Sequence, residues 1–322
     1  MPGCRESIVL KKGLIIMKSV VKRFISIIPV LIGVIILIFI MLRIVPGDPA
    51  AILLGEHVSQ ETVERLTKSM NLDKPMMVQF GSYLLGALHG DLGVSYNMKR
   101  PVTELILQAF PFTVRLALMA AVFAWIVGLT CGIIAAIRQN RLIDHLFMGF
   151  SLMGVSMPIF MTSLFLQYLL AFRFKVFALT SDGSFYSMIL PAIALGWNSA
   201  GRIARMTRSS LLEVMQADYI DTARAKGLTG GAVIIGHALK NSMLPVITMM
   251  ALQLSSMMSG AVITESIFAI PGIGRLATEA IQKRDMPLLQ GTVLFTTVIV
   301  VLGNLAADLL YSVLDPRIRK EA

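Results

Sequence analysis

Six long stretches without a charged side chain constrain this sequence more than any other feature. Each is close to the length of about 20 residues that a helix needs to cross a bilayer. They cover residues 24–42, 116–137, 146–172, 183–201, 241–264 and 286–307. In lipid every backbone amide needs a partner within its own segment, so such stretches form helices, whereas a membrane β-barrel would show segments of about 10 residues that alternate in polarity. The sequence predicts an all-α membrane protein with six transmembrane helices.

The distribution of charge predicts how these helices are oriented. Of the residues, 56% are hydrophobic and 15% are charged, against about 25% charged in soluble domains. More than half of the 29 Lys and Arg residues fall in the short segments on one side of the predicted helices. The positive-inside rule assigns that side to the cytoplasm, so both termini are expected there. The net charge of +10 follows from this topology, and no aromatic-interleaved basic face indicates nucleic-acid binding.

The chain divides into four parts. Residues 1–16 are expected to be a non-structural extension, either a misplaced start or a frayed tail, because a basic cluster after Met17 makes a natural beginning. Residues 17–108 hold the first helix, an uncleaved anchor without a signal-peptide exit, and a small extracytoplasmic subdomain between spans one and two. Residues 109–315 hold the other five helices, and residues 316–322 form a cytoplasmic tail. The outer loop at residues 265–285 is expected to be a re-entrant or surface-lying hairpin.

Proline and glycine mark points inside the predicted helices. Pro158 and Pro191 lie within the third and fourth stretches, and Pro245 lies near the start of the fifth. Proline kinks a helix and frees backbone carbonyls, which fits a bundle around a pathway and ordinary packing equally well. Gly128 and Gly132 match the GxxxG pattern of close packing, which is more often packing inside one chain than a subunit contact.

Patterns for catalysis and for metal binding are missing from the sequence. The four histidines have no His or Cys partner at metal-ligand spacing, and the 21 methionines fit flexible packing better than soft-metal binding. The phosphate-binding pattern GxxxxGK[ST] is absent, because His237 and Ala238 follow the second glycine of the pair Gly231 and Gly236. We therefore expect no catalytic site, no metal site and no cofactor bound by this chain.

Polar residues within the last predicted helix are few. Asn304 lies in the sixth stretch, and Asp308 follows one helical turn later. An acid in a membrane helix is a functional candidate by default; the alternative for Asp308 is a bond to a neighbouring helix. A single acid offers no relay of titratable groups, which disfavours a proton-driven carrier.

The cytoplasmic segment between the fourth and fifth helices, about residues 207–245, carries the clearest signal. Residues 218–227 read Asp-Tyr-Ile-Asp-Thr-Ala-Arg-Ala-Lys-Gly, which predicts a short polar helix ended by a glycine suited to a C-cap. Such a helix is too polar to enter lipid, and because it is joined to two spans it can pass force to a partner. A solvated loop explains the same residues equally well.

This segment resembles the EAA loop of ABC importer permeases, in the form found in the dipeptide, oligopeptide and nickel permease family. Asp221-Thr222-Ala223-x-x-x-Gly227 stands where Glu-Ala-Ala-x-x-x-Gly is usual, and Leu244-Pro245 closes the segment. Further motifs of the family follow in order along the chain from residue 17. They are PGDP at 46–49, GDLGxS at 90–95, ExIFxxPGIGR at 265–275 and DPRIR at 315–319.

The resemblance implies a type I ABC importer transmembrane domain in the bacterial plasma membrane. It implies a second homologous permease subunit in a heterodimer, two ATP-binding cassette subunits that carry ATP and Mg²⁺, and an extracytoplasmic solute-binding protein. Ala223 and Gly227 would give the ATPase a close-fitting surface, and Asp221 and Arg224 would orient it. The implied coupling residues are Asp218, Asp221, Thr222, Ala223, Arg224, Gly227, Leu244 and Pro245, and the implied binding-protein contacts are Asp48 and Asp91.

Family likeness makes di- or oligopeptides the expected cargo. One alternative keeps the machine and changes the cargo to nickel or a metal chelate. The other is a self-sufficient channel or ion-coupled carrier, which the scarcity of charged residues in the predicted spans disfavours.

Overall fold

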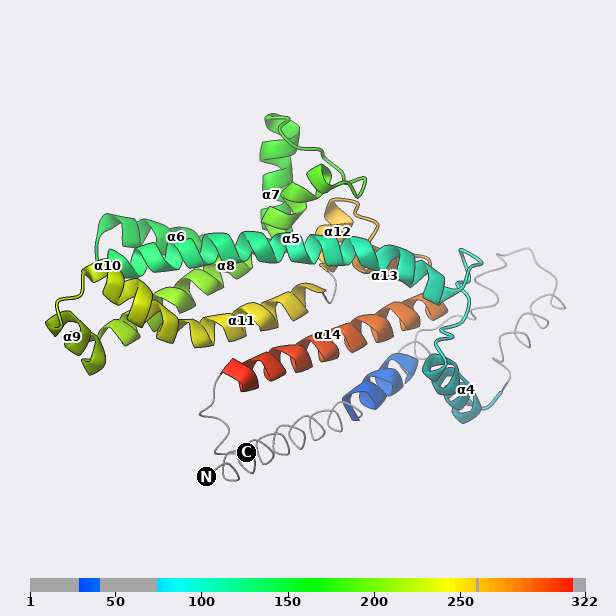
Figure 1. Cartoon of the computed structure of the whole chain (residues 1–322). Coiled ribbons are helices and arrows are strands. Elements are labelled where there is room, and N and C mark those ends of the chain that lie inside the picture. The colour runs from blue at the N-terminus through cyan, green and yellow to red at the C-terminus, as the bar shows by residue number, and fades with distance from the viewer. Residues whose placement is uncertain (1–28, 41–73, 259–260, 315–322) are drawn as a thin grey trace, which may run out of the picture.

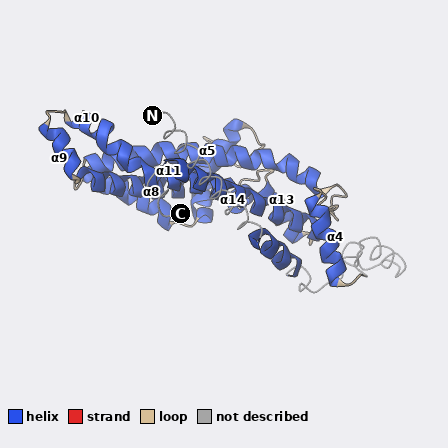
Figure 2. Ribbon diagram, turned by 60° about the horizontal axis from the view of Figure 1, so that its bottom comes forward, coloured by secondary structure: helices blue, strands red, loops and turns tan. Residues whose placement is uncertain are grey.

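The computed structural model describes residues 29–40, 74–258 and 261–314, which contain helices and loops but no strand (Figure 2). The expected all-α fold is therefore confirmed. The first described helix is Pro29–Ile40. It is followed by α4 Met76–Leu88, α5 Val102–Ile137, α6 Leu142–Ser156, α7 Ile159–Leu166 with its π-helical continuation η1 Gln167–Arg173, α8 Phe185–Met215, α9 Asp218–Ala225, α10 Gly230–Val233, η2 Ile234–Leu239, α11 Lys240–Met258, α12 Val262–Ile267, α13 Ile273–Gln282 and α14 Met286–Leu314.

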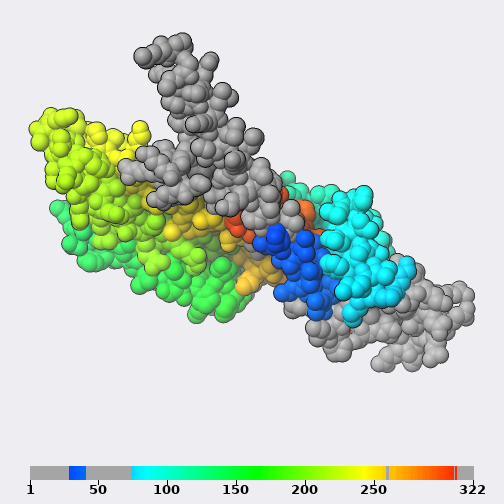
Figure 3. Space-filling model, turned by 90° about the horizontal axis from the view of Figure 1, so that it is seen from below, coloured from blue at the N-terminus to red at the C-terminus, as the bar shows by residue number. Residues whose placement is uncertain are grey.

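The long helices run lengthwise in one bundle (Figure 1). Helices α5, α8, α11 and α14 lie side by side, and α6 runs along α5 and α8. The short helices α9 and α10 occupy one end of the bundle, while α4 and α13 lie at the other. Helix Pro29–Ile40 packs beside α4 (Figure 3), where the Phe39 and Phe80 rings meet edge to face with centroids 5.2 Å apart.

Small residues let α5 and α8 approach closely. Ala120 and Ala124 of α5 are fully buried. A Cβ added to Gly132 would lie 2.6 Å from the carbonyl oxygen of Ala204 on α8, and one added to Gly128 would lie 2.7 Å from a side-chain atom of that helix. The GxxxG pair therefore packs inside the chain, as predicted.

The third uncharged stretch is not one continuous helix, which corrects the prediction. Helix α6 ends at Ser156, Met157 is extended, and α7 begins after Pro158. The two helices meet at an angle of 109°, and α7 stands away from the bundle axis (Figure 1). Proline lacks an amide hydrogen and disfavours helical backbone at the preceding residue. Pro191 and Pro245 lie inside the continuous helices α8 and α11.

The number of membrane spans is only partly determined. Among the described residues, three helices are long and apolar enough to cross a membrane, namely α5, the helical run Gly230–Met258 and the part of α14 at Met286–Ala307. The bent pair α6–α7 counts as a fourth if it forms one span. The first predicted span lies partly outside the described residues, so the count of six stays a prediction.

Helices α5 and α8 extend more than ten residues beyond their uncharged stretches. Helix α5 has 36 residues, a length of about 54 Å, and begins 14 residues before the stretch at 116–137. Helix α8 continues from residue 201 to Met215 through Arg202, Arg205 and Arg208. These extensions carry the bundle past its apolar part, toward α13 at one end and α9 at the other.

Candidate functional site

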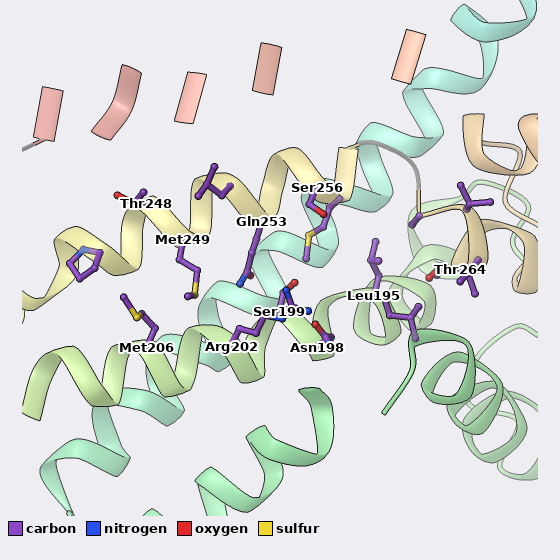
Figure 4. A pocket seen from close by; sticks show the side chains of 17 residues that line it. Leu195, Asn198, Ser199, Arg202, Met206, Thr248, Met249, Gln253, Ser256 and Thr264 are labelled. Atoms are coloured by element: carbon purple, nitrogen blue, oxygen red, sulfur yellow. The ribbon is translucent and has the colours of Figure 1, made fainter. Parts of the chain in front are cut away.

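A cavity of about 810 Å³ lies between α8, α11 and the start of α12 (Figure 4). Its lining positions follow one face of each long helix, since they recur three or four residues apart. Helix α8 contributes Leu195, Asn198, Ser199, Arg202 and Met206, and α11 contributes Pro245, Thr248, Met249, Leu252, Gln253, Ser256 and Met257. The volume falls within the range of about 300–1,000 Å³ that is typical of small-molecule sites.

The lining of the cavity combines apolar walls with a few polar groups. The Asn198 side chain donates a hydrogen bond to the carbonyl of Gly154 at 3.1 Å. The amide oxygen and nitrogen of Gln253 are both buried and have no hydrogen-bond partner among the described residues. Among the described lining residues Arg202 alone is charged. No group of three His, Cys, Asp or Glu residues among the described ones is placed to hold a metal ion.

Sequence reasoning did not identify these cavity residues. The signal that was available is the helical spacing of Asn198 and Arg202 on α8 and of Gln253 and Ser256 on α11. Polar residues three or four positions apart in an apolar helix mark a shared face, but only the packing of the two helices shows that the faces oppose each other.

Helix α9 lies at the end of the bundle opposite α13 (Figure 1). Its apolar side packs against the rest of the chain. Ile220 and Ala223 pack into a buried cluster with Leu211, Val233 and Ala238. The Tyr219 hydroxyl accepts a hydrogen bond from the Asn241 amide at 3.0 Å, which links α9 to the start of α11. Helix α9 is therefore in direct contact with a helix that lines the cavity.

The predicted coupling residues on α9 fall on two faces. Asp218, Asp221, Thr222 and Arg224 are exposed, and Arg224 pairs with Asp221 at 3.1 Å. Ala223 is only 6% exposed and faces the chain's own core. Their polar surface is available to a partner, whereas the Ala223 side chain is largely covered.

The end of the motif is split between two places. Gly227 follows α9 with φ of +77°, and no described heavy atom lies within 4 Å of a Cβ added there. Leu244 and Pro245 lie on α11, where Pro245 lines the cavity. The structure thus brings Asp218–Gly227 together at the tip and places Leu244-Pro245 nearer the cavity.

An ion pair that the sequence analysis missed braces the same end. Arg208 on α8 donates two hydrogen bonds to Asp144 on α6, each 2.7 Å long. Asp144 is 1% exposed and also accepts the amide of Asn140 at 2.9 Å. Helices α6 and α8 are therefore fixed to each other beneath α9.

At the end of the bundle that holds α13, the loop that contains Asp91 is tied to the start of α14. Asp91 accepts a hydrogen bond from the Gly93 amide at 2.9 Å, which is a local turn. The buried Asp285 carboxylate accepts from the Ser95 hydroxyl at 2.6 Å and from the amides of Tyr96 and Asn97 at 3.1 and 3.0 Å. Asp91 itself is exposed.

The hairpin α12–α13 is tied to α5 by a buried acid. Glu265 is fully buried, and it accepts hydrogen bonds from the Thr113 hydroxyl at 2.8 Å and the Arg275 amide at 3.1 Å. The Thr113 oxygen in turn accepts from the Ile273 amide at 2.9 Å. Burial raises the pKa of Glu265 above its usual value.

The remaining predicted residues are less informative. Asn304 is exposed on α14. Asp308 belongs to α14, but its side chain lies outside the described part of the chain, and Asp48 also lies outside the described residues.

Comparisons with known proteins agree over nearly the whole chain. A family model described as "Binding-protein-dependent transport system inner membrane component" matches residues 128–320, and a model for the N-terminal part of such membrane components matches residues 16–117. The chain is 40% identical to the dipeptide transport system permease protein DppB of Escherichia coli (strain K12), over 94% of this chain and 99% of the relative. It is 41% identical to the protein of the same name from Alkalihalophilus pseudofirmus, over 92% and 98%.

A solved structure shares the fold. In an inward-facing structure of the MetNI methionine ABC transporter, one chain superposes with a TM-score of 0.54 at 16% identity, covering 66% of this chain and 96% of that one. This similarity shows that the fold is that of a type I ABC importer transmembrane subunit.

Proposed function

The chain belongs to the family of binding-protein-dependent transport system inner membrane components, and on this premise we propose that it lines part of the path by which an ATP-driven importer takes up di- or oligopeptides. The observation that carries the proposal is identity of about 40% to dipeptide permeases over nearly the full length of both chains. The relatives are permease subunits, so the chain is a transport component and not an enzyme. The nickel alternative is not favoured by these relatives.

A permease of this family works with ATPase subunits and a solute-binding protein, and is a multi-pass inner membrane protein. Our proposal adds a second, non-identical permease subunit that completes the path, with both termini in the cytoplasm. ATP and Mg²⁺ are bound by the two ATPase subunits and no cofactor by this chain. The exposed Asp91 is proposed as part of the surface for the binding protein, together with Asp48.

The proposed coupling route runs from α9 to the cavity. An ATPase subunit contacts the exposed side of α9, and displacement of that helix is passed on by Ile220 and Ala223 through the buried cluster beneath them. The hydrogen bond between Asn241 and Tyr219 links the same helix to α11. Because α8 and α11 both line the cavity, a change in their separation alters access to it. Alternating access requires such a linkage between the ATPase site and the path.

Uptake by intact cells tests the proposal. Deletion of this chain should abolish accumulation of radiolabelled dialanine, and expression of the chain from a plasmid should restore it. Accumulation of ⁶³Ni²⁺ should be unchanged by the deletion. Dialanine uptake that persists without the chain, after other peptide permeases have been deleted, would contradict the peptide assignment. Solute flux in liposomes that contain this chain alone would instead support a self-sufficient channel or carrier.

A further inference from the structure

The cavity between α8 and α11 has one cationic group and no anionic one among its described lining residues, so its charge is complementary to an anionic solute. Arg202 is exposed, lines the cavity, and forms no hydrogen bond or ion pair with a described residue. Arginine stays charged at all physiological pH values, and its planar guanidinium matches a carboxylate with two parallel hydrogen bonds. A solute with a carboxylate would satisfy donors that the described part of the chain leaves unpaired.

The Gln253 side chain is a second polar group without a described partner, and it faces Arg202 across the cavity (Figure 4). Its side chain extends from α11 toward Ser199 and Arg202 on α8 (Figure 4), and its amide oxygen and nitrogen are buried without a described partner. A buried amide without hydrogen bonds is costly, so such groups in native structures usually have a ligand, water or functional role. The Gln253 amide can donate to a carboxylate oxygen and accept from a peptide amide.

Apolar side chains make up much of the remaining lining. Met206, Met249 and Leu252 are among them, and such walls can pack against the apolar parts of a solute while a few polar groups orient it. The volume of about 810 Å³ is in the range that holds a small solute. The site therefore combines room for a peptide with donors for only one of its two charged ends.

We propose that Arg202 and Gln253 form a subsite for the C-terminal carboxylate of the transported peptide. The inference rests on the proposed function and goes beyond it, because it gives the permease its own recognition of peptide ends. A carboxylate side chain of the second permease subunit could pair with Arg202 in the same way as a peptide terminus. Comparing peptides with and without a free carboxylate distinguishes these two partners of Arg202.

Binding to the complete permease–ATPase complex in nanodiscs, without binding protein, tests the subsite. We expect radiolabelled dialanine to bind the wild type about tenfold more tightly than dialanine amide, the contribution of one charge-assisted hydrogen-bonded contact. Arg202→Gln should weaken dialanine binding about tenfold and leave dialanine amide unchanged, and Arg202→Lys should restore part of the preference. Arg205→Gln is the matched control, because Arg205 is exposed on the same helix but does not line the cavity.

A second variant keeps the test valid if Arg202→Gln fails to assemble. Gln253→Leu removes an amide that has no described partner, so assembly should be preserved while dialanine binding weakens. The inference is overturned if the wild type binds no dialanine at millimolar concentration or does not prefer it to the amide. It is also overturned if Arg202→Gln binds dialanine as tightly as the wild type. Equal weakening of both peptides would assign Arg202 to an ion pair with the partner subunit and likewise overturn it.

These outcomes are distinct from failure of the proposed function. If deletion of the chain abolishes dialanine uptake while the Arg202 variants show no change in selectivity, only the subsite fails. If dialanine uptake does not depend on the chain, the proposed function itself fails.

Discussion

In the folded chain, some residues of Asp218–Gly227 face the buried cluster beneath α9 and others face outward. Ile220 and Ala223 face the cluster beneath the helix, whereas Asp221 and Thr222 are exposed. The eight residues of α9 include few large apolar side chains. Their sequence predicts a helix, but the apolar stripe is too short to predict which side of the helix faces the rest of the chain. The exposed polar side of α9 is therefore the part that a partner would touch.

Gly227 offers a substitution test of this surface. Its φ of +77° is a conformation that Asn and Asp tolerate better than other side chains do. Gly227→Asp adds a charge at the tip and should lower dialanine transport and partner-stimulated ATP hydrolysis by at least about tenfold, because an unmatched charge at an interface costs several kcal/mol. Gly227→Asn is the control of equal size and backbone preference, and it should retain most activity. Normal transport by Gly227→Asp would contradict the coupling role.

Glu265 gives a pH dependence with a defined sign. Its pKa is raised above 4.5 by burial, so the folded hairpin binds a proton more tightly than the unfolded chain does. The hairpin α12–α13 should be most stable below pH 4.5 and lose stability as pH rises through the raised pKa. Hydrogen exchange over residues 262–282, corrected for intrinsic rates, should show this loss in the wild type and not in Glu265→Gln. Glu279→Gln, at a half-buried position of α13 that pairs with the Arg275 side chain at 3.0 Å, should keep the wild-type trend. An identical trend in Glu265→Gln would rule out Glu265 as the source.

At the scale of helices, the close contact between α5 and α8 depends on glycines, which have no side chain, at the contact positions. Gly132 faces the Ala204 carbonyl, and Gly196 of α8 faces the Ala120 carbonyl at 2.6 Å from an added Cβ. Helices that approach this closely gain van der Waals contact along their length. Of these two helices, α8 also carries one face of the cavity and the Arg208 side chain that pairs with Asp144, so its contact with α5 supports the helix that bears the site.

Two glycine-to-alanine variants separate packing from helix propensity. Gly132→Ala should destabilise the protein by about 1–3 kcal/mol, as overpacking does in cores. Gly149→Ala lies in α6 with no described atom within 4 Å of the added Cβ, so it should be neutral or stabilise the helix by up to about 1 kcal/mol. The midpoint of thermal unfolding of the purified complex measures both. Equal shifts for the two variants would contradict close packing at Gly132.

At the scale of the whole molecule, the two ends of the bundle carry different machinery. The tip at α9 is polar and projects from the four long helices, and the far end holds α13 and the loop tied to Asp285 (Figure 1). The uneven distribution of Lys and Arg predicts that the α9 end is cytoplasmic. This orientation places the ATPase contact and the binding-protein contact on opposite sides of the membrane.

Cysteine labelling tests that orientation. In a variant that lacks Cys4 and Cys131, Lys226→Cys at the α9 end and Gln282→Cys at the end of α13 are both exposed positions. A membrane-impermeant maleimide added to right-side-out spheroplasts should label Gln282→Cys and not Lys226→Cys. Inverted vesicles should give the opposite result. Labelling of Lys226→Cys from outside would show that the α9 end is extracytoplasmic, and it would contradict the proposed contact between α9 and the ATPase.

The helical membrane class and the family could be predicted from the residues alone, and the GxxxG pattern favoured the internal contact that the structure shows. Long uncharged stretches admit only helices in lipid, and ordered motifs at fixed spacing identify a family without knowledge of contacts. The tertiary structure decided what depends on the direction in which a side chain points. It broke the third stretch at Pro158, turned Ala223 inward, and opposed Arg202 to Gln253 across a cavity. Composition and periodicity fix a helix along its own axis, whereas its bend and rotation against a neighbour are set by packing between residues far apart in the chain.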